Sequence, residues 1–137
     1  MKRILTRAVL AGSGTLLGLI GGALLFAPKA FLEMSHVFVK RDASLMSELS
    51  APSGILLIAC AVMILGTIRN KHADLALLVG AIVYGGYGMG RLISIGLHGV
   101  PSESLLTATI IELGVAATLV ALRQRQIANT YIGGAIV

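Results

Sequence analysis

Long apolar segments alternate with short polar ones along the chain. Four segments with almost no internal charge stand out, at residues 8–27, 51–68, 75–97 and 105–122. An α-helix needs about 20 residues to cross the roughly 30 Å hydrocarbon core of a bilayer. The segments lack the alternating polarity of outer-membrane β-strands. The pattern therefore predicts an all-α integral membrane protein with four spans.

The connections predict how these spans are arranged. Residues 69–74 and 98–104 are short, so they join antiparallel neighbours and predict an up-down four-helix bundle that forms one domain over residues 1–137. Residues 28–50 carry apolar side chains at helical spacings between charged ones, which is typical of a short helix in the membrane interface. An irregular loop is the alternative there. We expect the tail, residues 127–137, to be weakly ordered or to lie on the membrane surface.

Composition supports the membrane assignment. Of 137 residues, 56% are hydrophobic and 12% are charged, whereas soluble domains carry about 25% charged residues. A chain this short and apolar cannot bury its hydrophobic surface in water, which excludes a soluble globular or disordered protein. The net charge of +5 comes from residues that flank the spans, so it indicates membrane topology and no nucleic-acid partner.

The basic residues also predict an orientation. Seven lie on the side shared by both termini and three on the other side. The seven are Lys2, Arg3, Arg7, Arg69, Lys71, Arg123 and Arg125, and the three are Lys29, Lys40 and Arg41. The positive-inside rule then places both termini in the cytoplasm. The first segment is too long for a signal-peptide core and precedes no A-x-A site, so we expect it to remain as a span.

Small residues at four-residue spacing predict where helices approach closely. The first span carries Gly14, Gly18 and Gly22, and the third carries Gly86 and Gly90. Such ridges let helix backbones pack tightly, either inside one bundle or at the seam of a homodimer. The sequence leaves both alternatives open.

The third and fourth spans each contain one charged residue, Arg91 and Glu112. A charge in the middle of a span costs about 2.5–3.5 kcal/mol on insertion scales, so each needs a partner or a polar cavity. Counting from the connection that joins these two spans, the charges lie at depths of roughly 9 and 12 Å. We therefore predict that they form a pair.

Further polar residues extend this pair into a candidate site in the outer half of the bundle. Spacings of three and four residues draw one polar stripe along the third span. The stripe consists of Tyr84, Tyr87, Arg91, Ser94 and His98. Glu48 precedes the second span on the same side, where it either joins the cluster or stays in water.

This cluster has several possible roles. It is a structural ion pair, a pocket for a lipid-like or small polar ligand or a partner helix, an ion path, or a catalytic site around His98. No catalytic motif is present, and His36, His72 and His98 lie in separate connections, so we expect no metal and no cofactor. The favoured interpretation is a non-enzymatic membrane protein that holds such a ligand or partner. A small membrane enzyme acting on a hydrophobic substrate, and a transporter or assembly subunit, are the alternatives.

Three parts of the sequence together resemble a known family. They are residues 47–54 (SELSAPSG), residues 90–94 (GRLIS) with 99–102 (GVPS), and Glu112. They are similar to a bacterial four-span membrane family described as domain of unknown function four-three-four-five. The family tends to carry an acidic residue where His98 stands and arginine where Ser50 stands. The resemblance implies a fold and, with the charge distribution, a location in the bacterial inner membrane, and it implies no established activity.

Overall fold

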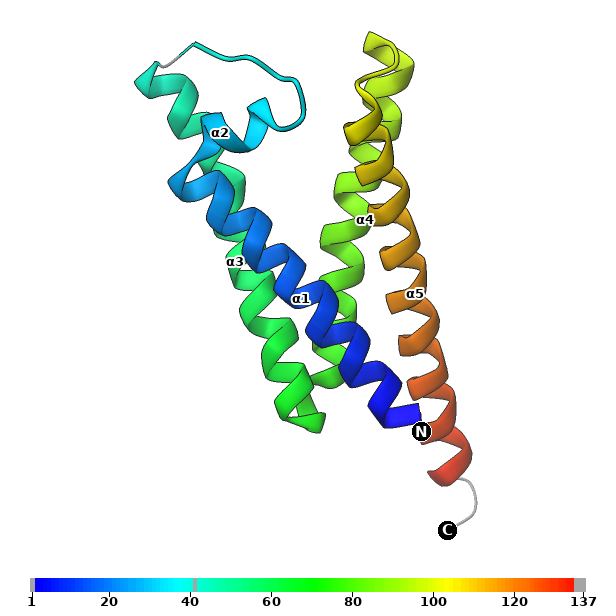
Figure 1. The fold of residues 1–137 in the computed structure, drawn as a ribbon. Helices are drawn as coiled ribbons and strands as arrows, with labels where there is room; N and C mark the ends of the chain where they lie inside the picture. Colours follow the sequence, from blue (N-terminus) through cyan, green and yellow to red (C-terminus); the bar gives the residue numbers. More distant parts are fainter. Residues whose placement is uncertain (1, 41, 135–137) are drawn as a thin grey trace.

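The computed structural model describes residues 2–40 and 42–134, and within them every regular element is a helix (Figure 1). The long helices are α1 (Lys2–Phe26), α3 (Ala43–Ile68), α4 (Ala73–His98) and α5 (Glu103–Gly134). Two short ones, α2 (Pro28–Glu33) and the 3-10 helix η1 (Asn70–His72), lie in the connections. Each long helix is long and apolar enough to cross a membrane. The predicted all-α four-helix class is therefore confirmed.

Local chemistry fixes where the long helices begin and end. The side chain of Asp42 accepts a hydrogen bond from the Ser44 backbone N–H at 3.3 Å and so caps the start of α3. At the far end of α4, Gly99 adopts a positive φ of 92°, a conformation that favours glycine and stops the helix. Because α4 ends at His98 and α5 begins at Glu103, the connection between them is short, as the sequence predicted.

The connection between the first two spans combines the two structures considered for it. Pro28, with its fixed φ, begins the short helix α2, and the chain then turns at His36, whose φ is 60°. Residues 37–40 are not helical. Residues 43–50, the last part of the segment predicted to hold an interfacial helix, instead form the first turns of α3.

The C-terminal tail differs from the expectation. Residues 127–134 continue α5 as one uninterrupted helix, and residues 135–137 lie outside the described residues. No proline or capping glycine follows the fourth apolar segment before Gly133, so nothing in the chain stops the helix where the apolar pattern ends.

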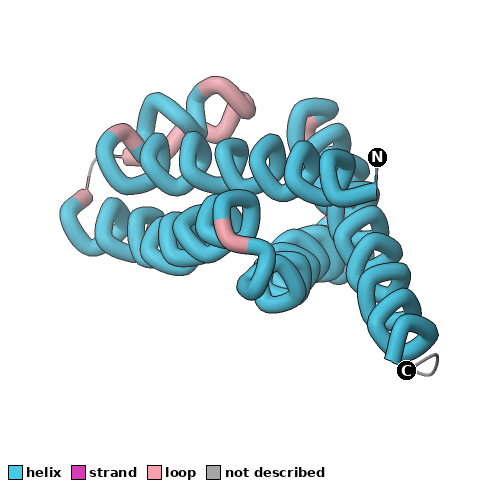
Figure 2. Tube along the Cα trace, turned by 90° about the horizontal axis from the view of Figure 1, so that it is seen from below, coloured by secondary structure: helices cyan, strands magenta, loops and turns pink. Residues whose placement is uncertain are grey.

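The long helices form two pairs. α1 packs along α3, α4 packs along α5, and α3 and α4 hold the pairs together, whereas α1 touches α5 only slightly. Leu10, Met63, Leu77 and Leu119 are fully buried where the pairs meet. Seen from below, the pairs lean away from each other rather than closing into a square bundle (Figure 2).

The two ends of the molecule differ in charge and in packing. We call the end with η1, the start of α1 and the residues around Arg123 the basic end, and the opposite end the α2 end. Figure 1 shows the helix pairs diverging towards the α2 end. In agreement, the buried residues of α4 stop at Gly88, ten residues before the helix ends.

The glycine ridge of α1 packs against α3 inside the chain. A Cβ atom at Gly14 would lie 3.0 Å from Met63 Cβ, and one at Gly18 would lie 2.8 Å from Cys60 Sγ. The third close position is Gly21, where a Cβ atom would lie 3.0 Å from Leu56 Cβ. A Cβ atom at Gly22 would have nothing within 4 Å. An α-helix turns about 100° per residue, so a strict four-residue spacing drifts off the interface, and a step of three residues returns to it.

The glycines that pack on α4 also differ from those expected. Gly86 and Gly90 have nothing within 4 Å in the described chain, so they do not line a helix interface there. Gly80 and Gly88 do: a Cβ at Gly80 would lie 2.9 Å from Leu119, and one at Gly88 would lie 2.7 Å from Leu113. A Cβ at Gly80 would also lie 2.8 Å from Met63 of α3, so Gly80 packs where three helices meet, whereas the nearest atoms to Gly88 all belong to Leu113 of α5.

Candidate functional site

Arg91 of α4 and Glu112 of α5 form an ion pair within the membrane-spanning segments. Arg91 Nε donates to both carboxylate oxygens, at 3.0 and 3.2 Å. The side chain of Glu112 is 14% exposed and that of Arg91 is 34% exposed. The short α4–α5 connection makes these helices antiparallel neighbours, which brings the two charges to one level.

The contact with Glu112 uses only one of the three guanidinium nitrogens. Among the described residues, the hydrogen bonds of Arg91 all run through Nε. A bidentate pair would also engage a terminal nitrogen. The two terminal nitrogens make no hydrogen bond to any described residue.

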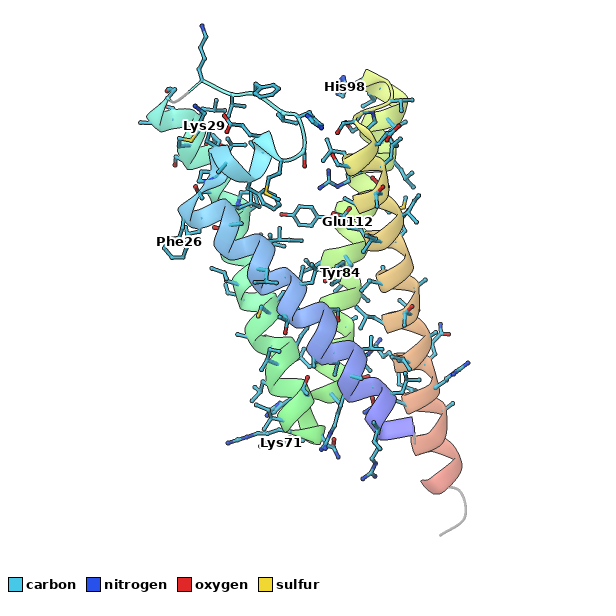
Figure 3. The ribbon with its side chains drawn as sticks, viewed as in Figure 1. Phe26, Lys29, Lys71, Tyr84, His98 and Glu112 are labelled. Atoms are coloured by element: carbon cyan, nitrogen blue, oxygen red, sulfur yellow. The ribbon has the colours of Figure 1, made fainter. Side chains whose placement is uncertain are left out.

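Tyr84 lies deeper and links the two helix pairs. Its side chain is 2% exposed, and its hydroxyl donates a 2.7 Å hydrogen bond to the backbone carbonyl of Ser13 on α1. Figure 3 shows Tyr84 between α1 and α4, and Glu112 nearer the α2 end. Tyr84 therefore belongs to the packed core rather than to a ligand site.

The rest of the α4 stripe becomes steadily more exposed. Tyr87, one turn before Arg91, is half-buried and packs against the core. Ser94 and His98 are exposed, and His98 is the last residue of α4, at the tip of the α2 end in Figure 3. The stripe thus leads from the core through the ion pair to the surface.

Glu48 does not join this stripe in the structure. It is exposed near the start of α3, and within the described residues no hydrogen bond or ion pair connects it to Arg91 or His98. The start of α3 and the end of α4 lie on the two diverging pairs (Figure 1). The structure therefore does not bring Glu48 to the Arg91–Glu112 pair.

Two connections were not anticipated from the sequence. At the basic end Arg123 of α5 binds Asp74 of α4 with two hydrogen bonds, Nε to Oδ1 at 3.0 Å and Nη2 to Oδ2 at 3.2 Å. At the α2 end the Ser102 hydroxyl donates to the backbone carbonyl of Ser35 at 3.1 Å. The depth argument that pairs Arg91 with Glu112 would also have paired Asp74 with Arg123, had it been applied to the other end of α4.

The arrangement can hold a polar group, and it lacks the components of a metal centre. In the described part of the chain, no three His, Cys, Asp or Glu side chains come close enough to bind a metal ion. The groups that do come together are the Arg91–Glu112 ion pair, the phenol of Tyr87 and an apolar helix surface. Their chemistry is hydrogen bonding and charge pairing at a site partly shielded from water.

Comparison with known proteins gives the family. No curated protein and no solved structure matches the chain. A family model described as Domain of unknown function (DUF4345) matches residues 5–123, which include all four spans and the Arg91–Glu112 pair. This match extends the resemblance seen in the sequence to the first span. The chain therefore belongs to the family described as Domain of unknown function (DUF4345).

Proposed function

We propose that this protein binds the polar head of an amphiphile at the Arg91–Glu112 pair. One observation carries the proposal: the Arg91 side chain is 34% exposed although it lies within a membrane-spanning helix. A charged group in contact with hydrocarbon is costly, so the exposed part needs a polar companion. The polar head of a lipid-like molecule, or a small polar ligand, meets that need.

The surroundings suit an amphiphile better than a small ion. The terminal nitrogens of Arg91 supply donors for a head group, and Glu112 compensates the charge. One turn before and one turn after Arg91 on the same face of α4, Tyr87 and Ile95 are partly exposed and offer apolar surface to a tail. Apolar surface with a few convergent polar groups is the usual character of small-molecule sites.

We further propose the cellular setting. The seven basic residues at the basic end, against three at the other, favour a plasma-membrane protein with both termini in the cytoplasm. In a bacterium this is the inner membrane. The candidate site then lies in the outer half of the bilayer and opens through Ser94 and His98 towards the outer surface.

Native mass spectrometry of the full chain in detergent tests the proposal. The probes are oleate and monooleoylglycerol, which share one tail and differ in head charge. We expect the wild type to retain at least one of them. The double variant Arg91→Met/Glu112→Leu removes the site while leaving no unpaired charge, and it should lower occupancy at least fivefold.

The control removes the other ion pair between the same helices, in the variant Asp74→Leu/Arg123→Met. It should retain the probe as the wild type does, because this pair lies at the basic end. The proposal is wrong if the wild type retains neither probe, or if the Arg91/Glu112 variant binds as well as the wild type. Equal losses in both double variants would also overturn it, because binding would then depend only on the integrity of the α4–α5 pair.

A further inference from the structure

A groove runs between α1 and α5, the two helices that touch each other least among neighbours. Two pockets lie along it, one of about 780 Å³ at the basic end and one of about 410 Å³ beside the next turns of both helices. The first is lined by four residues of α1 and four of α5, and also by Gly66 of α3, Asn70 of η1 and Ala73 of α4. The second is lined by residues 8–13 and 111–118. The two pockets thus follow each other along one seam.

The pocket at the basic end is strongly positive. Arg3, Arg7 and Arg125 line it, and Arg7 Nη2 donates a 3.1 Å hydrogen bond to Asn70 Oδ1 at its rim. The sequence places one acidic residue at this end, Asp74, and its carboxylate is paired with Arg123. Among the described residues no ion pair joins the three pocket arginines to a carboxylate, and an anion is the complementary ligand.

The neighbouring pocket is lined mainly by apolar residues. Gly12 of α1 and Gly114 of α5 form part of its wall, and a Cβ atom at either position would meet nothing within 4 Å. Its two hydroxyls are already used, since Ser13 donates to the Val9 carbonyl and Thr118 donates to the Gly114 carbonyl. The groove therefore offers hydrocarbon surface to whatever fills it.

A cationic pocket that continues into an apolar groove matches one kind of molecule. We propose that the α1–α5 seam binds one anionic phospholipid, with its phosphate among Arg3, Arg7 and Arg125 and an acyl chain along Gly12 and Gly114. Basic pockets between helices on the cytoplasmic side are known to bind anionic head groups. This site lies at the end of the bundle opposite to Arg91 and does not depend on the function proposed above.

The test measures lipid retention by the purified full chain with native mass spectrometry. The probes are dioleoylphosphatidylglycerol, dioleoylphosphatidylcholine and inorganic phosphate. We expect one phosphatidylglycerol to be retained at least fivefold better than phosphatidylcholine, and millimolar phosphate not to displace it. The variant Arg3→Gln/Arg125→Gln should abolish this preference.

Two control variants are matched to the two parts of the site. Arg69→Gln/Lys71→Gln removes the same charge from the same end outside the pocket, and it should leave the preference intact. Gly12→Leu/Gly114→Leu should fill the groove and lower phosphatidylglycerol retention several-fold, whereas Gly54→Leu, which is also open to the outside, should not.

Three results would overturn the proposal. Equal retention of both lipids would mean that the seam takes any lipid. An equal loss in the Arg69/Lys71 variant would mean that the overall charge of the basic end acts, and not the pocket. Displacement by phosphate alone would assign the arginines to a free anion. If the glycine variants fail to fold, the arginine variants still decide between these results.

Discussion

At the scale of single residues, variants of Arg91 and Glu112 can show whether their ion pair stabilises the fold or serves a function. Removing one partner leaves the other uncompensated, which costs about 3–5 kcal/mol for a buried pair. Because Arg91 is one-third exposed, we expect the lower part of this range. Arg91→Met and Glu112→Leu should each lower the free energy of unfolding, measured by denaturation in detergent.

The double variant should recover much of this loss, since two apolar residues of similar size replace a neutral pair. Simple addition of two mild effects would show that the residues are not coupled. A double variant that folds well in vitro but loses a cellular phenotype would assign the pair to function.

Tyr84 provides a second prediction at this scale. Tyr84→Phe deletes the hydroxyl that donates to the Ser13 carbonyl and should lower the free energy of unfolding by about 1 kcal/mol. Tyr87→Phe is the matched control, because within the described residues the Tyr87 hydroxyl has no hydrogen-bond partner. Equal effects of both substitutions would contradict the role assigned to the Tyr84 hydrogen bond.

The sequence predicts one of the two charged pairs between α4 and α5, and no other polar contact. Arg91 and Glu112 could be matched because a charge in a span demands compensation and the short connection fixes the depth of both. The partner of Tyr84 could not be found this way, because the acceptor is a backbone carbonyl, which every residue has. Glu48 could not be placed, because the sequence does not say that the helix pairs diverge.

At the scale of helices, the glycine seam of α1 decides how closely α3 approaches. Gly18→Leu should force the helices apart, since its Cβ alone would lie 2.8 Å from Cys60 Sγ. We expect a loss of about 1–3 kcal/mol, the usual cost of overpacking a core. Gly22→Leu, four residues further along the same helix, meets open space and should change stability little.

Thermal unfolding of both variants in detergent measures the difference. If Gly22→Leu destabilises as much as Gly18→Leu, the seam of α1 follows the strict four-residue spacing. The sequence showed the ridge on α1 but not its exact members, because a spacing rule cannot say where the partner helix crosses. On α4 the sequence predicted contacts at Gly86 and Gly90, but the close contacts occur at Gly80 and Gly88, for the same reason.

At the scale of the whole molecule, the distribution of basic residues predicts the topology. In a Cys60→Ala background, single cysteines at Lys71 and Gln126 should react with a membrane-impermeant maleimide only after the membrane is broken. A cysteine at Lys29 or Lys40 should react in intact cells. Labelling of Lys71 and Lys29 positions from the same side would contradict the up-down arrangement.

The number of spans, the helical class and the order of neighbours followed from the apolar pattern, because a bilayer allows few alternatives. The opening of the helix pairs did not follow from it. In lipid, apolar side chains gain little by facing each other rather than hydrocarbon. Hydropathy therefore carries no information about how tightly the four helices close.

The division into two helix pairs also implies an order of assembly during synthesis. The seam of α1 and α3 uses only the first 68 residues of the chain, so it can form before α4 is made. Arg91, in contrast, leaves the ribosome 21 residues ahead of its partner Glu112. Until α5 arrives, α4 carries an uncompensated charge that opposes its release into lipid. We therefore expect the second pair to enter the bilayer together, as a hairpin, beside a first pair that can already have formed.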